Sequence, residues 1–144
     1  QVEFLISTNP GSAPGSLAKI ASGGELSRIS LALQVAAAES ATAPTMIFDE
    51  VDVGIGGGVA EVVGELLNQL SQRVQVLCVT HLAQVACKGL NHLQVSKTGD
   101  AAAVFTEVNM LETEARVEEI ARMQGGLTIT ESTRAHAREM LNLH

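Results

Sequence analysis

Three acidic residues occur within four positions, directly after a short apolar run. Thr45 to Asp49 is typical of a buried strand, and Glu50 and Asp52 follow it. Adjacent carboxylates at the end of a buried strand can divide two tasks: one holds a hydrated Mg²⁺ and the other aligns a water molecule for attack on phosphorus. A solvated strand end without a ligand is the alternative. Because acids so close together repel one another unless a cation or donors offset them, we favour the catalytic interpretation.

A histidine, His81, follows the next strand-like run, Val74 to Thr80. A lone histidine near a strand end is more often structural than catalytic. If the two strands are sheet neighbours, however, His81 lies beside the acidic cluster, where its imidazole can contact a terminal phosphate group. The other histidines, His92, His136 and His144, are interpreted as structural.

A third candidate site is the segment Ser22, Gly23, Gly24 and Glu25. Ser22 and Glu25 have the spacing of a helix-capping box. The two glycines leave the first backbone N–H groups of the helix uncovered, and with the positive end of the helix dipole they offer a place for anionic oxygens. By spacing alone, an ordinary capped helix is the simpler interpretation.

The elements that must position these residues alternate between helix and strand. In chain order we expect a helix from Ser22 to about Ser40, the strand Thr45–Asp49, a glycine turn over residues 54–58, a helical stripe of apolar residues over 59–70 and the strand Val74–Thr80. A strand, helix, strand order implies parallel pairing through a right-handed crossover, with ligands beyond the carboxyl ends of the strands. The acids and His81 lie at those ends.

The flanking segments carry less chemistry. Residues 1–7 are expected to form a strand and 8–21 a flexible loop, because Gly, Pro and Ser dominate the latter. We further expect a hairpin with strands 92–97 and 102–108, turning at Thr98, Gly99 and Asp100, and helices over 113–124 and 130–143. The charged residues of the first of these helices, Glu112, Glu114, Glu118 and Glu119 with Arg116 and Arg122, are typical of a solvated face.

The composition bounds the class of protein. With 144 residues, 46% of them hydrophobic, the chain can bury one core and is not disordered throughout. Nine Lys and Arg against 16 Asp and Glu give a net charge of -7, so DNA contact has to come from elsewhere. Cys78 and Cys87 are expected to be reduced core thiols of a cytosolic protein. The sequence has no bilayer-length apolar run and no leader, and its start at Gln1, inside a strand-like run, suggests a piece of a longer protein.

Four motifs, taken in order, resemble the second half of an ABC-type ATPase head. The motifs are residues 21–28 (Ala-Ser-Gly-Gly-Glu-Leu-Ser-Arg), 48–55 (Phe-Asp-Glu-Val-Asp-Val-Gly-Ile), 79–86 (Val-Thr-His-Leu-Ala-Gln-Val-Ala) and 119–126 (Glu-Ile-Ala-Arg-Met-Gln-Gly-Gly). Their sequences are similar to those of the RecN family, bacterial SMC-like ATPases of DNA double-strand-break repair. The resemblance covers nearly the whole chain, and it implies an α/β fold: the C-terminal lobe of a P-loop ATPase head, with a mainly parallel sheet flanked by helices.

The resemblance also implies a role for each motif. Ser22, Gly23 and Gly24, followed by Glu25, would be the signature turn that closes over the γ-phosphate of ATP bound to a second head in a homodimer. Among the acids, Asp49 would be the Walker B carboxylate that orders the Mg²⁺ shell, Glu50 the catalytic carboxylate that polarises water, and Asp52 the D-loop acid that crosses the dimer interface. His81 would be the switch histidine.

Several parts of such a head are missing from the sequence. No G-x-x-x-x-G-K-[ST] motif occurs, so nothing here wraps the α- and β-phosphates. The glutamine loop and long coiled coil are absent too, while Gly56–Gly58 and Gln124 are minor departures from the family pattern. We therefore expect this chain to be inactive alone and to work with an N-terminal Walker A lobe and coiled coil of the same protein. The family further implies DNA engagement through the complete protein, no membrane partner and a cytoplasmic, nucleoid-associated location.

Two other functions stay open at this point. A freestanding interaction module that kept the fold and lost hydrolysis is supported by the absent Walker A motif, whereas the set Asp49, Glu50 and His81 argues against it. The nucleotide-binding domain of a membrane transporter is a weaker alternative, because residues 22–28 fit the SMC-like signature sequence better than that of a transporter.

Overall fold

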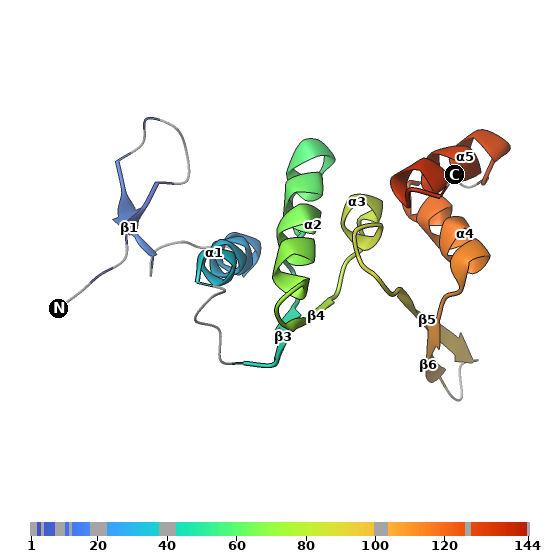
Figure 1. The fold of residues 1–144 in the computed structure, drawn as a ribbon, viewed down its shortest axis with the longest axis horizontal. Coiled ribbons are helices and arrows are strands. Elements are labelled where there is room, and N and C mark those ends of the chain that lie inside the picture. Colours follow the sequence, from blue (N-terminus) through green and yellow to red (C-terminus); the bar gives the residue numbers. More distant parts are fainter. Residues whose placement is uncertain are drawn as a thin grey trace.

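The structure is a computed structural model that describes residues 3, 5–7, 11, 13–17, 23–37, 43–99, 104–125 and 128–143. Helices and short strands follow one another along this length (Figure 1). In chain order the elements are β1 (Leu5–Ile6), β2 (Gly15–Ser16), α1 (Gly23–Ala36), β3 (Thr45–Phe48), α2 (Gly57–Ser71), β4 (Gln75–Cys78), α3 (Ala83–Ala86), β5 (Leu93–Gly99), β6 (Val104–Met110), α4 (Thr113–Met123) and α5 (Glu131–Met140).

The strands form three separate pairs within the described residues, and only the pair of β3 and β4 is parallel. Thr45 pairs with Gln75 and Phe48 with Cys78, and α2 makes the crossover between the two strands. The expected mainly parallel sheet is therefore not confirmed for this chain. The reason is connectivity: β5 and β6 are joined by a short link and fold back as an antiparallel hairpin, whereas a parallel pair needs a long crossover.

One hydrophobic core, which we call the N-terminal core, packs α1 and α2 against one face of the β3–β4 pair. Its buried members are Leu31, Phe48, Val51, Ala60, Val63, Leu67, Leu70 and Val85. The helical stripe expected over residues 59–70 is confirmed as α2, but Val59 and Val62 are more than half exposed. Periodicity identifies an apolar helix face, yet it does not say how much of that face this chain covers.

A second core, the C-terminal core, lies between α3, α4 and α5. Its buried members are Ala83, Val117, Ile120, Ala121 and Ala137. The four-residue helix α3 joins the two cores, because Val85 packs into the first and Ala83 into the second. Arg116 of α4 fixes the segment that follows α3, since its guanidinium group donates hydrogen bonds to several main-chain carbonyl groups. The acceptors are Ala86, Cys87, Gly89 and Leu90.

Two charged residues of α4 are not on the solvated face that the sequence predicts. Arg116 is half-buried by its carbonyl contacts, and Glu119 is only 7% exposed. The Glu119 carboxylate accepts hydrogen bonds from Arg122 of the same helix and from Gln94 of β5, at 2.7 Å for Gln94. The hydrogen bond from Arg122 lowers the pKa of the Glu119 carboxyl group. Gln94 and the carbonyl partners of Arg116 lie 25 or more residues away, where a helical pattern does not reveal them.

The remaining elements agree with the predictions in type and differ in extent. β5 and β6 form the expected hairpin, but β5 runs to Gly99, so Thr98 and Gly99 belong to the strand rather than the turn. α4 and α5 are confirmed, and Thr130 caps α5 by accepting the Thr133 N–H. Two residues of the expected flexible loop, Gly15–Ser16, form β2 and pair with the backbone of β1 in an antiparallel arrangement. Much of that loop and the predicted end of the first helix lie outside the described residues.

Helix α2 lies close to α3 at Gly64. A Cβ atom at this position would lie 2.9 Å from the Gln84 carbonyl oxygen and 2.9 Å from Cγ of Lys88. We predict that Gly64→Ala lowers the free energy of unfolding by about 1 kcal/mol, because overpacking costs about 1–3 kcal/mol and helix propensity returns only about 1 kcal/mol. Urea unfolding followed by circular dichroism measures the change.

Gly58 of the same helix is the matched control. A Cβ atom there would meet no heavy atom of the described residues within 4 Å. Gly58→Ala should therefore raise the free energy of unfolding by about 0.5–1 kcal/mol through helix propensity alone. Changes of the same sign in the two variants would contradict the close approach of α2 to α3.

Candidate active site

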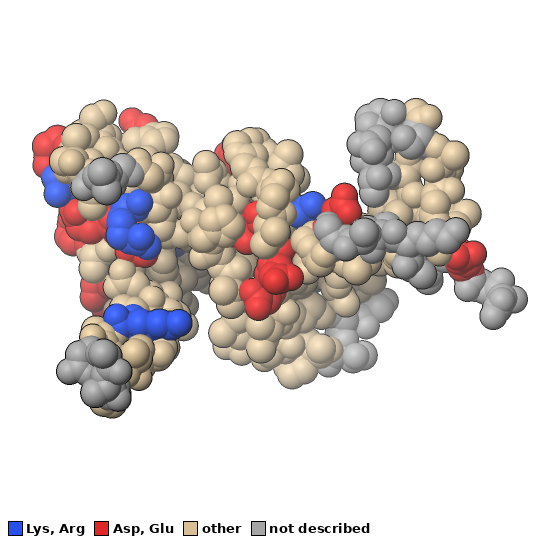
Figure 2. All heavy atoms as spheres, turned by 180° about the vertical axis from the view of Figure 1, so that it is seen from behind, with Lys and Arg blue, Asp and Glu red and all other residues tan. Residues whose placement is uncertain are grey.

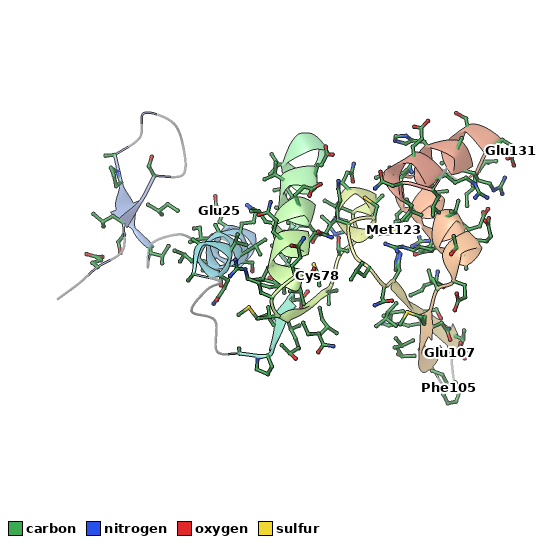
Figure 3. The ribbon with its side chains drawn as sticks, viewed as in Figure 1. Glu25, Cys78, Phe105, Glu107, Met123 and Glu131 are labelled. Carbon is green, nitrogen blue, oxygen red and sulfur yellow. The ribbon has the colours of Figure 1, made fainter. Side chains whose placement is uncertain are left out.

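The site candidates from two segments meet at one end of the β3–β4 pair. Pairing continues past the strand ends, because the Val79 N–H donates to the Phe48 carbonyl oxygen at 2.9 Å. Residues 49–53 and 79–82 therefore leave the sheet side by side, next to α2 and the start of α1 (Figure 3). The expectation that the two strands are neighbours is confirmed.

The first two acids are held by the backbone. The Glu50 N–H donates to Asp49 Oδ1 at 2.9 Å, and Glu50 has φ of 58°. This left-handed conformation is costly for a residue with a side chain, and it persists only where the surroundings enforce it. Both side chains are exposed. Asp49 Oδ2 accepts no hydrogen bond within the described part of the chain, so it is available to a ligand.

The two glycines at the start of α1 lie against the acidic segment. A Cβ atom on Gly23 would come within 2.9 Å of Glu50 Oε2, and one on Gly24 would lie 3.0 Å from the Val53 carbonyl oxygen. A side chain at Gly24 would crowd the main chain of Glu50 and Val53, whereas a side chain at Gly23 would meet only the flexible end of the Glu50 side chain. Ser22 lies outside the described residues, so the predicted capping box with Glu25, which Figure 3 labels on α1, stays a prediction.

Two polar side chains of α1 bind the same segment through its carbonyl groups. The Ser27 hydroxyl group donates to the Asp49 carbonyl oxygen at 3.2 Å. Arg28 Nη1 donates to the Val53 carbonyl oxygen at 2.9 Å and lies 3.5 Å from that of Val51. Sequence reasoning quoted Ser27 and Arg28 within a motif but gave them no role, because their partners are main-chain atoms more than 20 residues away.

The carboxylate of Asp52 is turned inward within this chain. The residue is only 2% exposed, and Oδ2 accepts hydrogen bonds from the Thr80 hydroxyl group and from the His81 N–H at 3.0 Å. The role predicted for Asp52 at a dimer interface stays a prediction; within this chain its carboxylate binds the segment that follows β4. Hydrogen bonds from Thr80 and His81 offset the free-energy cost of burying the Asp52 carboxylate, which explains why an acid is tolerated at this position.

His81 is oriented by the same carboxylate. Its Nδ1 atom lies 3.3 Å from Asp52 Oδ2, while 69% of the side chain remains exposed. A carboxylate at one ring nitrogen fixes the direction of the ring and leaves the other nitrogen, Nε2, free to face a ligand. Thr80, which donates to Asp52 and accepts the Leu82 N–H at 3.0 Å, completes this arrangement and was missed from the sequence.

Carboxylates for a metal ion are present, but they do not form a closed cage. Within the described residues no group of three or more His, Cys, Asp or Glu side chains could hold a metal ion among themselves. Mg²⁺ in phosphate chemistry is held by one or two carboxylates together with phosphate oxygens and water. Asp49, whose Oδ2 atom accepts no hydrogen bond from the described residues, fits that kind of site better than a dedicated protein cage.

Curated bacterial proteins align with almost the whole chain. The protein named "DNA repair protein RecN" from Xylella fastidiosa (strain Temecula1) is 54% identical over 141 residues, which are 98% of this chain. Proteins of the same name from Vibrio cholerae and Haemophilus influenzae are each 54% identical over 97% and 99% of it. The chain is homologous to the C-terminal part of RecN.

The chain spans 25% of the length of these RecN proteins. A solved structure from work on ATP-driven dimerization and DNA-stimulated activation of SMC ATPases has a TM-score of 0.58 and 20% identity, and the match covers 86% of this chain and 81% of that one. This likeness shows that the fold is that of an SMC ATPase. No protein-family model matches the chain. Within the described residues, no helix is long and apolar enough to cross a bilayer.

The buried carboxylate of Asp52 leads to a stability prediction for this chain. Asp52→Ala removes the acceptor of the Thr80 hydroxyl group and the His81 N–H, and we expect the free energy of unfolding to fall by about 2–4 kcal/mol. Asp52→Asn keeps one acceptor oxygen and should lose less. Urea unfolding measures both variants, and equal stability of Asp52→Ala and the unmodified protein would contradict the inward contacts.

Cys78 on β4, labelled in Figure 3, should be a poor nucleophile. Burial, followed by the nearby charges of Asp52 and Asp49, raises the pKa of its thiol from 9.0 to about 12. Its thiolate fraction at pH 8 is then about a thousandfold smaller, so alkylation by iodoacetamide should be slowed to a similar degree. Peptide mass spectrometry measures the rate, with urea-unfolded protein as the control. An equal rate before and after unfolding would refute the burial.

Proposed function

We propose that this chain is the C-terminal ATPase-head segment of a RecN-like protein that repairs DNA double-strand breaks. It supplies the signature turn, the Walker B acids and the switch histidine for ATP binding and hydrolysis at a pair of heads. The observation that carries the proposal is the meeting of Gly23, Glu50 and His81 with its partner Asp52 at one end of the β3–β4 pair. Homology to RecN over 98% of the chain supports it.

The start of α1 serves as the part that contacts the γ-phosphate of ATP held by the second head. The first N–H groups of a helix have no partner within the helix, and the helix dipole favours an anion there. Gly23 and Gly24 leave these groups uncovered, with Ser22 before them and Glu25 after them. The tight contact of Gly24 with the Val53 carbonyl oxygen supports a requirement for glycine.

Asp49 and Glu50 divide the work on ATP at the chain's own head. Asp49 would hold Mg²⁺ through Oδ2, together with water and phosphate oxygens, and the ion would neutralise charge on the phosphate groups when bound. Glu50 aligns the attacking water with its exposed carboxylate, which the left-handed backbone holds beside the start of α1. The hydrogen bond between the Glu50 N–H and Asp49 keeps the two carboxylates in a fixed relation.

His81 contacts the γ-phosphate through Nε2. Asp52 does not contact the phosphate itself but acts by orienting His81. The Asp52 carboxylate sets both the backbone and the ring of His81, at 3.0 and 3.3 Å. A ring directed in this way donates a hydrogen bond without having to reorganise when phosphate arrives. We therefore assign Asp52 to positioning His81 within its own head.

The rest of the head covers the open side of the β3–β4 pair. On this face Ile47 is 72% and Val79 62% exposed, and Leu77 lies between them. Parallel strands in α/β proteins are usually covered on both faces. The sequence also lacks a P-loop to hold the α- and β-phosphates. The N-terminal Walker A lobe of the same protein fits both needs, and this chain is inactive without it.

DNA is bound by other parts of the complete protein. The chain has a net charge of -7, and on the face shown in Figure 2 acidic side chains gather near the middle of the molecule. Such a surface does not attract a phosphate backbone. The relatives are named for DNA repair, so coupling between DNA and this head runs through the segments that this chain lacks.

The decisive variant is Glu50→Gln in the complete protein. We expect turnover to fall at least about a hundredfold while ATP binding stays within about twofold, because the amide keeps the shape of the side chain and cannot accept a proton. Phosphate release measures turnover, and equilibrium binding of a fluorescent ATP analogue measures affinity.

Glu107→Gln is the control, since Glu107 is an exposed acid on β6, far along the chain from the acidic cluster (Figure 3). It should leave both quantities unchanged. Unchanged turnover in Glu50→Gln, in a protein that hydrolyses ATP, would remove Glu50 from the mechanism and with it the proposed function of this site.

A further inference from the structure

The segment that carries the acids is tied to α1 by its main chain. Carbonyl groups of residues 49, 50, 51 and 53 all face the first two turns of α1. Ser27 binds the first of them, Gly24 packs against Glu50 and Val53, and Arg28 Nη1 reaches Val51 and Val53. The Arg28 side chain is half-buried at this contact.

Arg28 is the strongest of these links. Its guanidinium group is always charged, and hydrogen bonds from a charged donor are roughly twice as strong as neutral ones. A Cβ atom on Gly24 would lie 3.1 Å from Arg28 Nη1, so the side chain folds back along the helix and packs against the glycine turn itself. The same cation thus touches both the start of α1 and the segment that follows Glu50.

We propose that Arg28 is a positioning residue that couples the two ATP sites in a pair of heads. This inference rests on the proposed function, in which α1 of one head contacts ATP on the other head while Glu50 works on its own head's ATP. When a γ-phosphate group binds the Gly23–Gly24 turn, α1 shifts relative to residues 49–53. Arg28 transmits this shift to those residues. The Glu50 carboxylate is then directed only when both heads carry ATP.

The physical basis is the strained conformation of Glu50. Its φ of 58° persists only if neighbouring contacts enforce it, and those contacts come from α1 on one side and Asp49 on the other. Without Arg28, the carbonyl groups of Val51 and Val53 lose their charged donor. Residues 50–53 are then free to relax independently of α1, while the fold of the cores does not depend on this side chain.

The test compares Arg28→Ala, Arg28→Lys and the unmodified sequence in the complete protein. We expect Arg28→Ala to lower kcat about tenfold or more, to change KM and ATP-analogue binding by less than about twofold, and to bring the Hill coefficient for ATP to about one. Arg28→Lys, which keeps a charged donor, should restore part of the loss. Arg138→Ala, which removes a similar contact between α5 and Glu114, is the control and should leave the Hill coefficient unchanged.

Mixed pairs of heads, purified through two different tags, separate coupling from simple loss of structure. A head with both Arg28→Ala and Glu50→Gln, paired with an unmodified head, should keep about half of the turnover, because the working Glu50 still has its own Arg28. A head with Arg28→Ala paired with one carrying Glu50→Gln should be almost inactive. A failure of the heads to pair, caused by Arg28→Ala, would lower both pairs equally, and the Hill coefficient separates coupling from a structural effect confined to one head.

The outcomes of this test and of the proposed function are distinct. If the complete protein hydrolyses ATP and Glu50→Gln abolishes turnover, but Arg28→Ala leaves kcat and the Hill coefficient as they are, the coupling role of Arg28 is wrong and the proposed function stands. Loss of kcat in proportion to a fall in ATP binding and melting temperature also overturns the coupling role. If Glu50→Gln itself has no effect, the proposed function fails first.

Discussion

The parallel register of β3 and β4 is the constraint on which the site depends. It sends two chain segments out of the sheet at the same edge, so Asp52 can reach donors that follow it by 28 and 29 residues. The α2 crossover, buried along one side, holds this register. A slip by one residue would turn every side chain to the other face and separate the carboxylate from His81. The chemistry of the site is therefore a product of strand pairing.

Beyond the sheet, the site is built mainly from main-chain atoms. Ser27 and Arg28 satisfy carbonyl groups of the acidic loop, and Arg116 does the same for the segment after α3. Loops that leave a sheet carry carbonyl groups that need donors when they are partly buried. Side chains from helices meet this need, and in doing so they join the acidic loop to α1 and the segment after α3 to α4.

Periodicity and motif order predicted the strands and helices around the site, because apolar spacing reflects burial directly. The same reasoning did not reveal that the Asp52 side chain points inward or that Glu119 is buried, since both depend on hydrogen-bond partners distant in sequence. It also treated Arg116 as solvated, although a charged group that binds carbonyls 26 to 30 residues away leaves no local pattern. The sequence pattern did not predict the exposure of Val62 either, because an apolar stripe does not show which protein segment will cover it.

The open apolar face of the β3–β4 pair has a consequence for the behaviour of the isolated chain. Ile47 and Val79 lie on this face and are more than half exposed. Unpaired strand edges and exposed apolar faces are templates for aggregation. The isolated chain is therefore expected to self-associate as its concentration rises, and any covering of this face removes the drive to do so.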